Sequence, residues 1–302
     1  MEVTDNMAGP VAVRSDKIWA DVAVLGVAVV WGASYPVAKG ALAYAPVLVL
    51  VFYRFLLTAV VMSGVAWRDL SAASTADRAC GLFLGAVLFS IFLTETYGVG
   101  LTSATNTALI ISLCTVLTPI LDYGLSKSAP PSGVIVGAIV SCAGVGVLAG
   151  GLTALSAGDL LVFGAACLRA VMVVTTKRLM AGRSLSSAAL TALQATTVCG
   201  LTLALLLAHI GPTGLFVDAD ARFWAAVAFL SLFCTIVAFY VQNAAVRRTS
   251  PTRVGFLMGT EPLFGFALAH LLLAEPLSAA SVIGACLIVA GTFAGIAAER
   301  SN

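Results

Sequence analysis

PVLVLVFYRFLLTAVVMSGVA, residues 46–66, is the stretch that decides the fold, and Arg54 is its single charged residue. A helix needs roughly 20 mostly apolar residues to cross the hydrocarbon core of a bilayer. This stretch is therefore predicted to span a membrane as an α-helix. Similar stretches run almost end to end along the 302 residues.

The composition extends this prediction to the whole chain. Hydrophobic residues make up 60% of it and charged residues only 10%, against about 25% charged residues in a soluble domain. Continuous apolar runs, without the alternation of β-barrel strands, exclude a barrel. The expected partner is thus the lipid bilayer, and a net charge of +2 gives no argument for nucleic acid.

Apolar runs separated by charges and turn residues predict ten membrane spans. The first run is too long for a secretory signal, so we expect it to be retained as the first membrane helix. Short tails are expected at both ends of the chain, at residues 1–18 and 299–302. The expected spans are residues 19–38, 46–66, 80–100, 104–125, 132–150, 158–176, 186–208, 223–245, 252–273 and 278–297.

Lysine and arginine accumulate in cytoplasmic loops, which tests this count. With the N-terminus inside, twelve basic residues fall on inner segments, and only Lys39 and Arg222 fall outside. The pattern predicts that both termini are cytoplasmic, in a bacterial inner membrane. The twelve are Arg14, Lys17, Arg68, Arg78, Lys127, Lys177, Arg178, Arg183, Arg247, Arg248, Arg253 and Arg300.

The chain also contains an internal repeat. From the third span onward the halves 19–150 and 151–298 align at an offset of 147, as Thr102 does with Thr249 (249 − 102 = 147). The first spans align at 138, as Asp21 does with Asp159 (159 − 21 = 138). Five helices per half is an odd number, so the second half is expected to lie inverted. Inverted repeats that meet near the midplane are typical of secondary transporters.

Several motifs resemble the drug/metabolite transporter superfamily, EamA type, over nearly the whole chain. WGASYPVAK at 31–39 is similar to its W-G-x-S-x-P-x-x-K signature, and FYRF at 52–55 to its second-helix arginine motif. RTSP at 248–251, GTEP at 259–262 and AEP at 274–276 resemble its second half. The resemblance implies ten helices around a central cavity lined by helices 1, 3, 4, 6, 8 and 9. It also implies a function like that of the bacterial amino-acid exporters.

Four charged residues stand clear of the predicted helix ends, namely Arg54, Glu95, Arg169 and Glu261. Charges in the membrane are costly and face the protein interior. Their depth predicts the pairs Arg54–Glu95 and Arg169–Glu261. Each pair is either a static packing contact or functional, with Arg169 binding a substrate carboxylate or a glutamate carrying a coupling proton.

Aromatic residues suggest the cavity wall. Trp31 and Tyr35 are four residues apart and share a helix face, while Gln242 aligns with Glu95 (242 − 95 = 147). Few charges and many aromatic rings suit an amphiphilic solute; ordinary packing is the alternative. The candidate binding residues are Trp31, Tyr35, Glu95, Tyr97, Arg169, Tyr240, Gln242 and Glu261.

Prolines within the spans are candidate gating points, because each removes a helix hydrogen bond. They are Pro36, Pro119 and Pro262. His270 is either a proton relay or a packing residue, and Arg54, Glu95 and Glu261 are the other coupling candidates.

We therefore predict a secondary transporter, an exporter of amino acids or similar metabolites, acting as a monomer or weak homodimer. A drug-like substrate or a nucleotide sugar on the same fold is the alternative. An intramembrane enzyme is disfavoured because H-E-x-x-H and G-x-S-x-G motifs are absent, and an ATP-driven pump because no phosphate loop occurs. The scattered cysteines indicate no metal, and no cofactor is expected.

Overall fold

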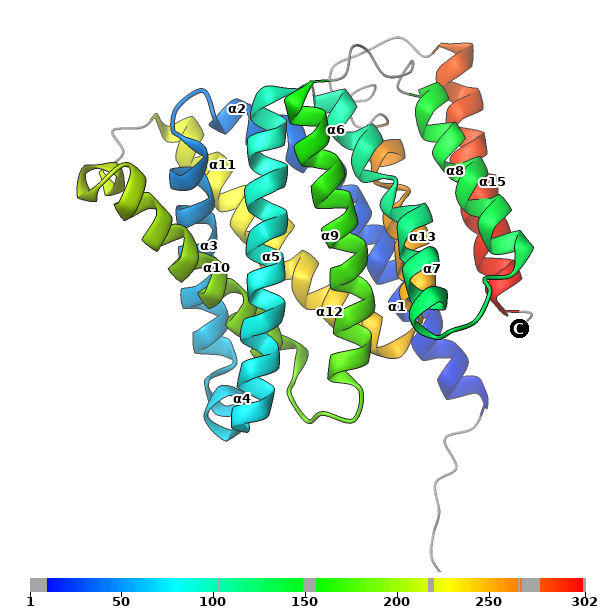
Figure 1. Ribbon diagram of the computed structural model, residues 1–302, viewed down its shortest axis with the longest axis horizontal. Coiled ribbons are helices and arrows are strands. Elements are labelled where there is room, and N and C mark those ends of the chain that lie inside the picture. Colours follow the sequence, from blue (N-terminus) through cyan, green and yellow to red (C-terminus); the bar gives the residue numbers. More distant parts are fainter. Residues whose placement is uncertain are drawn as a thin grey trace, which may run out of the picture.

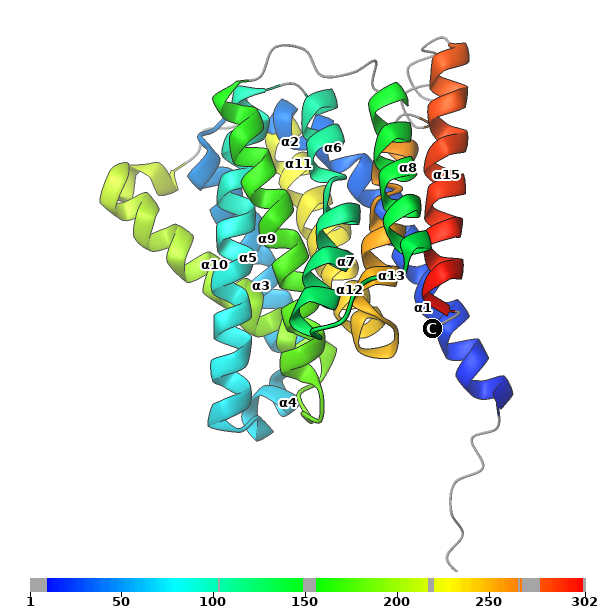
Figure 2. The ribbon, with the colours of Figure 1, turned by 45° about the vertical axis from the view of Figure 1, so that its right-hand side comes forward.

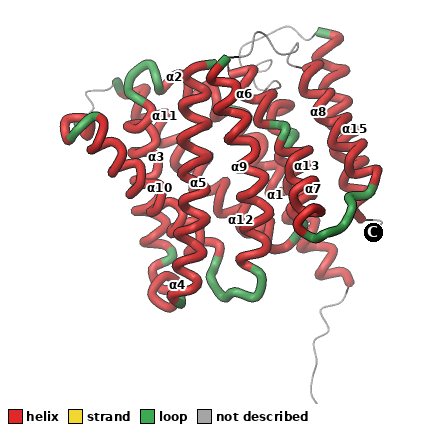
Figure 3. Tube along the Cα trace, in the orientation of Figure 1, coloured by secondary structure: helices red, strands yellow, loops and turns green. Residues whose placement is uncertain are grey.

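The computed structural model describes residues 10–102, 104–148, 156–216, 220–265, 267 and 278–300. Within this part of the chain the regular structure is helical throughout and no strand occurs (Figure 3). Most long helices run up and down through one bundle (Figure 1). The helices are α1 Pro10–Gly32, α2 Ser34–Ala41, α3 Val47–Val65, α4 Trp67–Ala72, α5 Thr75–Leu101, α6 Ala104–Ile111, α7 Cys114–Leu125, α8 Ser132–Leu148, α9 Ala157–Met180, α10 Ser187–His209, η1 Pro212–Leu215, α11 Ala221–Ser231, η2 Leu232–Val237, α12 Ala238–Arg248, α13 Pro251–Met258 and α15 Ala279–Arg300.

Seven helical stretches in the described chain are long and apolar enough to cross a membrane, and they coincide with seven of the expected spans. An eighth expected span, 132–150, corresponds to the shorter apolar helix at Ser132–Val147. The seven are Ile18–Ala41, Val47–Val65, Thr75–Leu101, Ala157–Met180, Ser187–His209, Ala221–Arg248 and Val282–Glu299.

The two remaining expected spans are not continuous helices. Residues 104–125 form α6 and α7, which are separated at Ser112–Leu113. The span expected at 252–273 begins as α13, breaks after Met258 and resumes as helix at Glu261. The two breaks occupy equivalent positions in the repeat, since 258 − 111 = 147.

Two of the three prolines follow helix breaks. Pro36 stands four residues after Gly32, the last residue of α1, and Pro262 stands four residues after Met258, the last of α13. Proline has no N–H to donate to the carbonyl four residues earlier, which explains why each helix ends there. Pro119 instead lies inside α7, which continues through it.

The ends of the chain and one loop hold more helix than expected. α1 begins at Pro10, inside the segment expected as a tail, and the short helix α4 follows α3. α1 begins and α15 ends on the same side of the bundle, at the bottom of Figure 1.

Residues aligned by the repeat take the same local conformation. Thr102 caps α5 with φ −129° and ψ −175°, and Thr249 caps α12 with φ −134° and ψ −172°. Lys39 donates from Nζ to the carbonyls of Val99 (3.1 Å) and Thr102, while Lys177 donates to that of Arg247 at 3.0 Å. In each half, a lysine of the first span thus donates to backbone carbonyls at the C-terminal end of the third span. A positive charge is favourable at this end of a helix.

Two further contacts join the halves at opposite ends of the bundle. Asp21 of α1 holds Arg253 of α13 through both carboxylate oxygens, with Nε at 2.5 Å from Oδ1. Asp159 of α9 accepts from Thr102 Oγ1 at 2.6 Å and Asn106 Nδ2 at 3.3 Å. Asn106 aligns with Arg253 (253 − 106 = 147), so each contact is the repeat counterpart of the other.

The last helix of each half packs against its counterpart. α8 and α15 lie side by side at one edge of the bundle (Figures 1 and 2). A Cβ on Gly144 would lie 2.7 Å from the Ile288 amide nitrogen, and one on Gly291 would lie 2.5 Å from that of Ser141. Glycine allows this backbone approach, as small residues do between membrane helices.

Candidate functional site

Arg169, on α9, lies between two buried glutamates. Its Nη2 is 2.8 Å from Glu95 Oε2 on α5, and its Nη1 is 3.3 Å from Glu261 Oε2. The guanidinium also stacks 4.9 Å above the ring of Trp31 on α1. One cation thus joins three segments from both halves, and the predicted Arg169–Glu261 contact is present.

The predicted Arg54–Glu95 pair is wrong, since Glu95 binds Arg169 instead. Arg54 Nε donates to Thr235 Oγ1 at 2.7 Å, and the guanidinium stacks 4.5 Å from the Phe92 ring centroid. Depth alone suggested the pair, but Arg54 occupies the face of α3 that packs against the long helix α11–η2–α12.

That long helix contains a π-helical segment, η2, beside the site. The Cys234 carbonyl accepts from the Trp31 indole nitrogen at 2.8 Å and from Arg54 Nη2 at 3.4 Å. A π-helical turn departs from the regular ladder of helix hydrogen bonds, and such turns are frequent at functional sites. Here it lets a backbone carbonyl fix the ring on which Arg169 stacks.

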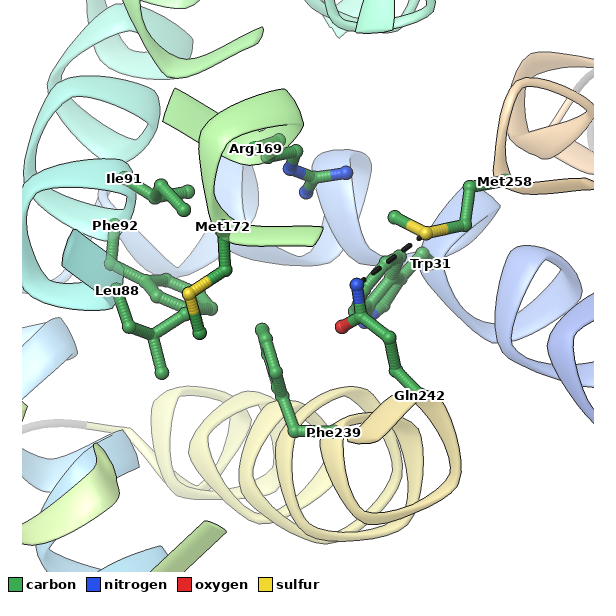
Figure 4. A pocket seen from close by; sticks show the side chains of 9 residues that line it. All are labelled: Trp31, Leu88, Ile91, Phe92, Arg169, Met172, Phe239, Gln242 and Met258. Atoms are coloured by element: carbon green, nitrogen blue, oxygen red, sulfur yellow. Dashed lines mark hydrogen bonds between the residues drawn. The ribbon is translucent and has the colours of Figure 1, made fainter. Parts of the chain in front are cut away.

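A small cavity of about 10 Å³ lies next to Arg169 (Figure 4). The guanidinium, the Trp31 ring and the Gln242 amide face it from α9, α1 and α12. Drug-sized ligands occupy pockets of about 300–1,000 Å³, so this cavity is too small to hold one as it stands. Its walls are Trp31, Leu88, Ile91, Phe92, Arg169, Met172, Phe239, Gln242 and Met258.

Residues that the repeat aligns face each other across this cavity. Arg169 aligns with Trp31 (169 − 31 = 138) and stacks on it. Phe92 aligns with Phe239 (239 − 92 = 147), and their ring centroids are 5.8 Å apart. The site therefore lies where the two halves meet.

Three of the eight predicted binding residues, Trp31, Arg169 and Gln242, line the cavity. Tyr35, Glu95 and Glu261 are buried but are not wall residues, and the remaining two are partly exposed. Tyr97 is 39% exposed and Tyr240 is 44% exposed. Each lies two residues from a residue of the site, Glu95 or Gln242, and two residues turn a helix by about 200°. Helical periodicity would have excluded both tyrosines.

The same periodicity would have found wall residues that were missed. Phe92 precedes Glu95 by three positions and Met172 follows Arg169 by three, so each shares the face of its charged neighbour. Tyr35 is buried and lies close to Glu261. Pro36 is exposed, and His270 and Ala274-Glu275-Pro276 lie outside the described residues.

Comparison with family models gives a match in both halves. The model of the EamA-like transporter family matches residues 18–150 and again 156–295. This chain belongs to that family. It is a multi-pass membrane protein of the drug/metabolite transporter superfamily, built from two EamA repeats.

A solved structure supports the fold of this EamA protein. A crystal structure of another protein aligns with 94% of this chain and 98% of its own chain, at 19% sequence identity and a TM-score of 0.76. At this identity the likeness shows the fold alone. No curated protein matches the chain.

Proposed function

We propose that this EamA protein is a secondary transporter that exports amino acids or similar small amphiphilic metabolites by alternating access. The observation that carries the proposal is Arg169, held between Glu95 and Glu261 beside a cavity with mostly apolar walls. The guanidinium offers bidentate hydrogen bonds to a carboxylate, and the aromatic and aliphatic walls suit an apolar side chain. A phosphate ester would need several convergent cations, and Arg169 is the only one among the wall residues.

The proposed architecture is ten transmembrane helices in two inverted five-helix halves in the inner membrane, with both termini cytoplasmic. The contacts of Asp21 and Asp159 support inversion, because these aligned residues join the halves at opposite ends of the bundle. The distribution of basic residues supports the orientation.

The contacts between the halves at the two ends of the bundle support alternating access. The Asp21–Arg253 and Asp159–Thr102 contacts are formed together, and the cavity between them is small. Such an arrangement is expected of an occluded intermediate, and opening one contact at a time would expose the site to one side. Inverted repeats are the general structural basis of such exchange.

In a proton-coupled transporter, Glu95 or Glu261 would carry the coupling proton. Two carboxylates share Arg169, so protonation of one leaves the other paired. Facilitated transport without coupling is the alternative, and the two differ in their response to a pH gradient.

Uptake into liposomes tests the function. The native chain, Arg169→Ala and the exposed-site control Arg222→Ala would be reconstituted and given labelled amino acids with and without a pH gradient. We expect saturable uptake of apolar amino acids by the native chain and the control, and its loss in Arg169→Ala. Folded native protein that transports no amino acid would overturn the proposed substrate class.

A further inference from the structure

The contact between Arg169 and Glu261 is the longer of the two ion pairs that Arg169 makes. Its 3.3 Å separation exceeds the 2.8 Å to Glu95, and charge-assisted N–H···O bonds usually measure about 2.7–2.9 Å. Glu261 is 2% exposed, and its Oε1 has no hydrogen-bond donor among the described residues. A buried polar atom without a partner costs free energy that a ligand recovers.

A second buried acceptor, in the wall of the cavity, also lacks a partner in the described chain. It is the Oε1 of Gln242, which is 6% exposed. The Tyr35 hydroxyl lies close to Glu261, but its single proton can complete only part of this acceptor set. Acceptor atoms without donors favour a ligand that carries several N–H groups on one small centre, as an ammonium does. Meanwhile Arg169 directs two of its nitrogen atoms at the glutamates, which leaves further N–H donors for an anion.

We infer that a zwitterionic substrate inserts into the Arg169–Glu261 pair. Its carboxylate takes the place of Glu261 on Arg169, and its ammonium binds Glu261 Oε1, with Gln242 as a further acceptor. Arg169 thus exchanges Glu261 for the substrate carboxylate, and Glu261 exchanges Arg169 for the substrate ammonium. Glu95 keeps Arg169 in position. This inference rests on the proposed function and narrows it, because the substrate must carry both charged groups.

The charge balance of the core favours the same ligand class. The formal charges of Arg54, Arg169, Glu95 and Glu261 sum to zero, and Arg54 contacts Thr235 rather than a carboxylate. A zwitterion adds no net charge to this buried site. An amine adds one positive charge and a carboxylic acid one negative charge, and net charge is costly in the membrane interior.

Matched ligands on the native protein provide the test. Binding to purified protein in lipid nanodiscs would be measured by calorimetry for leucine and phenylalanine. Each would be compared with the amine that lacks its carboxylate and the acid that lacks its ammonium. We expect the amino acid to bind about ten- to hundredfold more tightly than either counterpart, the range for a hydrogen bond to a charged group.

Glu261→Gln gives a second readout, with the exposed Asp69→Asn as the matched control. Without the carboxylate the amino acids are expected to bind at least tenfold more weakly. The acids should bind more tightly, because Arg169 Nη1 is released; a merely structural role would not produce this opposite shift.

The outcomes separate the two proposals. An acid that binds the native protein as tightly as its amino acid, or a Glu261→Gln variant that retains native amino-acid affinity, overturns the ammonium subsite and leaves the transporter proposal standing. If none of the six compounds binds folded native protein, the proposed substrate class fails, and the subsite fails with it.

Discussion

Substituting Asp21 with asparagine is expected to loosen one end of the bundle and leave the other unchanged. Asp21 binds Arg253 through both oxygens, and the two side chains are only 18% and 7% exposed. Hydrogen bonds to charged groups contribute about 1.5–3 kcal/mol. A loss of about 2 kcal/mol raises the ratio of open to closed forms at this end about thirtyfold.

Hydrogen–deuterium exchange in nanodiscs measures this change, because amide protection reports local opening free energy. In Asp21→Asn we expect faster exchange in α13 and the adjoining part of α1, at the end that we propose faces the cytoplasm. In Asp159→Asn we expect it at the start of α9 and in α6, at the opposite end. The exposed Asp69→Asn should change neither.

An equal rise at both ends in either variant would refute the reasoning, because it would show general destabilisation. Unchanged exchange in both variants would show that neither contact holds the halves together. Each single variant should also slow transport, since a transporter biased toward one side completes fewer cycles.

Three further predictions concern individual contacts. Gly144→Ala should lower the unfolding temperature by several degrees, because its Cβ would lie 2.8 Å from the Gly284 carbonyl oxygen, whereas Gly146→Ala on the same helix meets nothing within 4 Å and should not. Arg54→Met should lower stability by about 2 kcal/mol through loss of a charged hydrogen bond but retain amino-acid affinity; a large loss of affinity by calorimetry would contradict its packing role. Trp31→Phe keeps a ring for Arg169 to stack on but loses the hydrogen bond to the Cys234 carbonyl, so denaturant unfolding should show a loss of about 1 kcal/mol.

Much of the helical framework follows from the sequence because apolar length and charge are local properties. Seven of the expected spans match long apolar helices of the described chain. The breaks after Gly32 and Met258 also follow from local chemistry, as each precedes a proline by four residues. The separation of α6 from α7 does not, because no proline or glycine stands at Ser112–Leu113.

The site was predicted only in part because side-chain direction depends on rotation about each helix axis. The contact of Arg169 with Glu261 was predicted from depth in the membrane, but its shorter contact with Glu95 was not. Arg54 has similar depth to Glu95 but faces Thr235. The π-helical turn that places Thr235 and the Cys234 carbonyl there has no signature in apolar periodicity.

The pattern of difference between the halves has an electrostatic explanation. Some aligned residues away from the cavity are identical, as Thr102 and Thr249 are, and each of these two caps a helix of its own half. Where the halves meet, a residue contacts its own counterpart, so identical charges would face each other. An arginine at position 31 would lie against Arg169, whereas Trp31 offers a ring face that attracts the guanidinium.

The same argument applies to the acidic positions. Glu95 aligns with Gln242, and Glu261 aligns with Cys114 (261 − 114 = 147). Carboxylates at all four positions would place four negative charges around Arg169, which the buried site could not neutralise. A symmetric fold thus requires an asymmetric site. The zwitterion that we infer, with unlike groups at its two ends, is a ligand that such a site can bind in only one orientation.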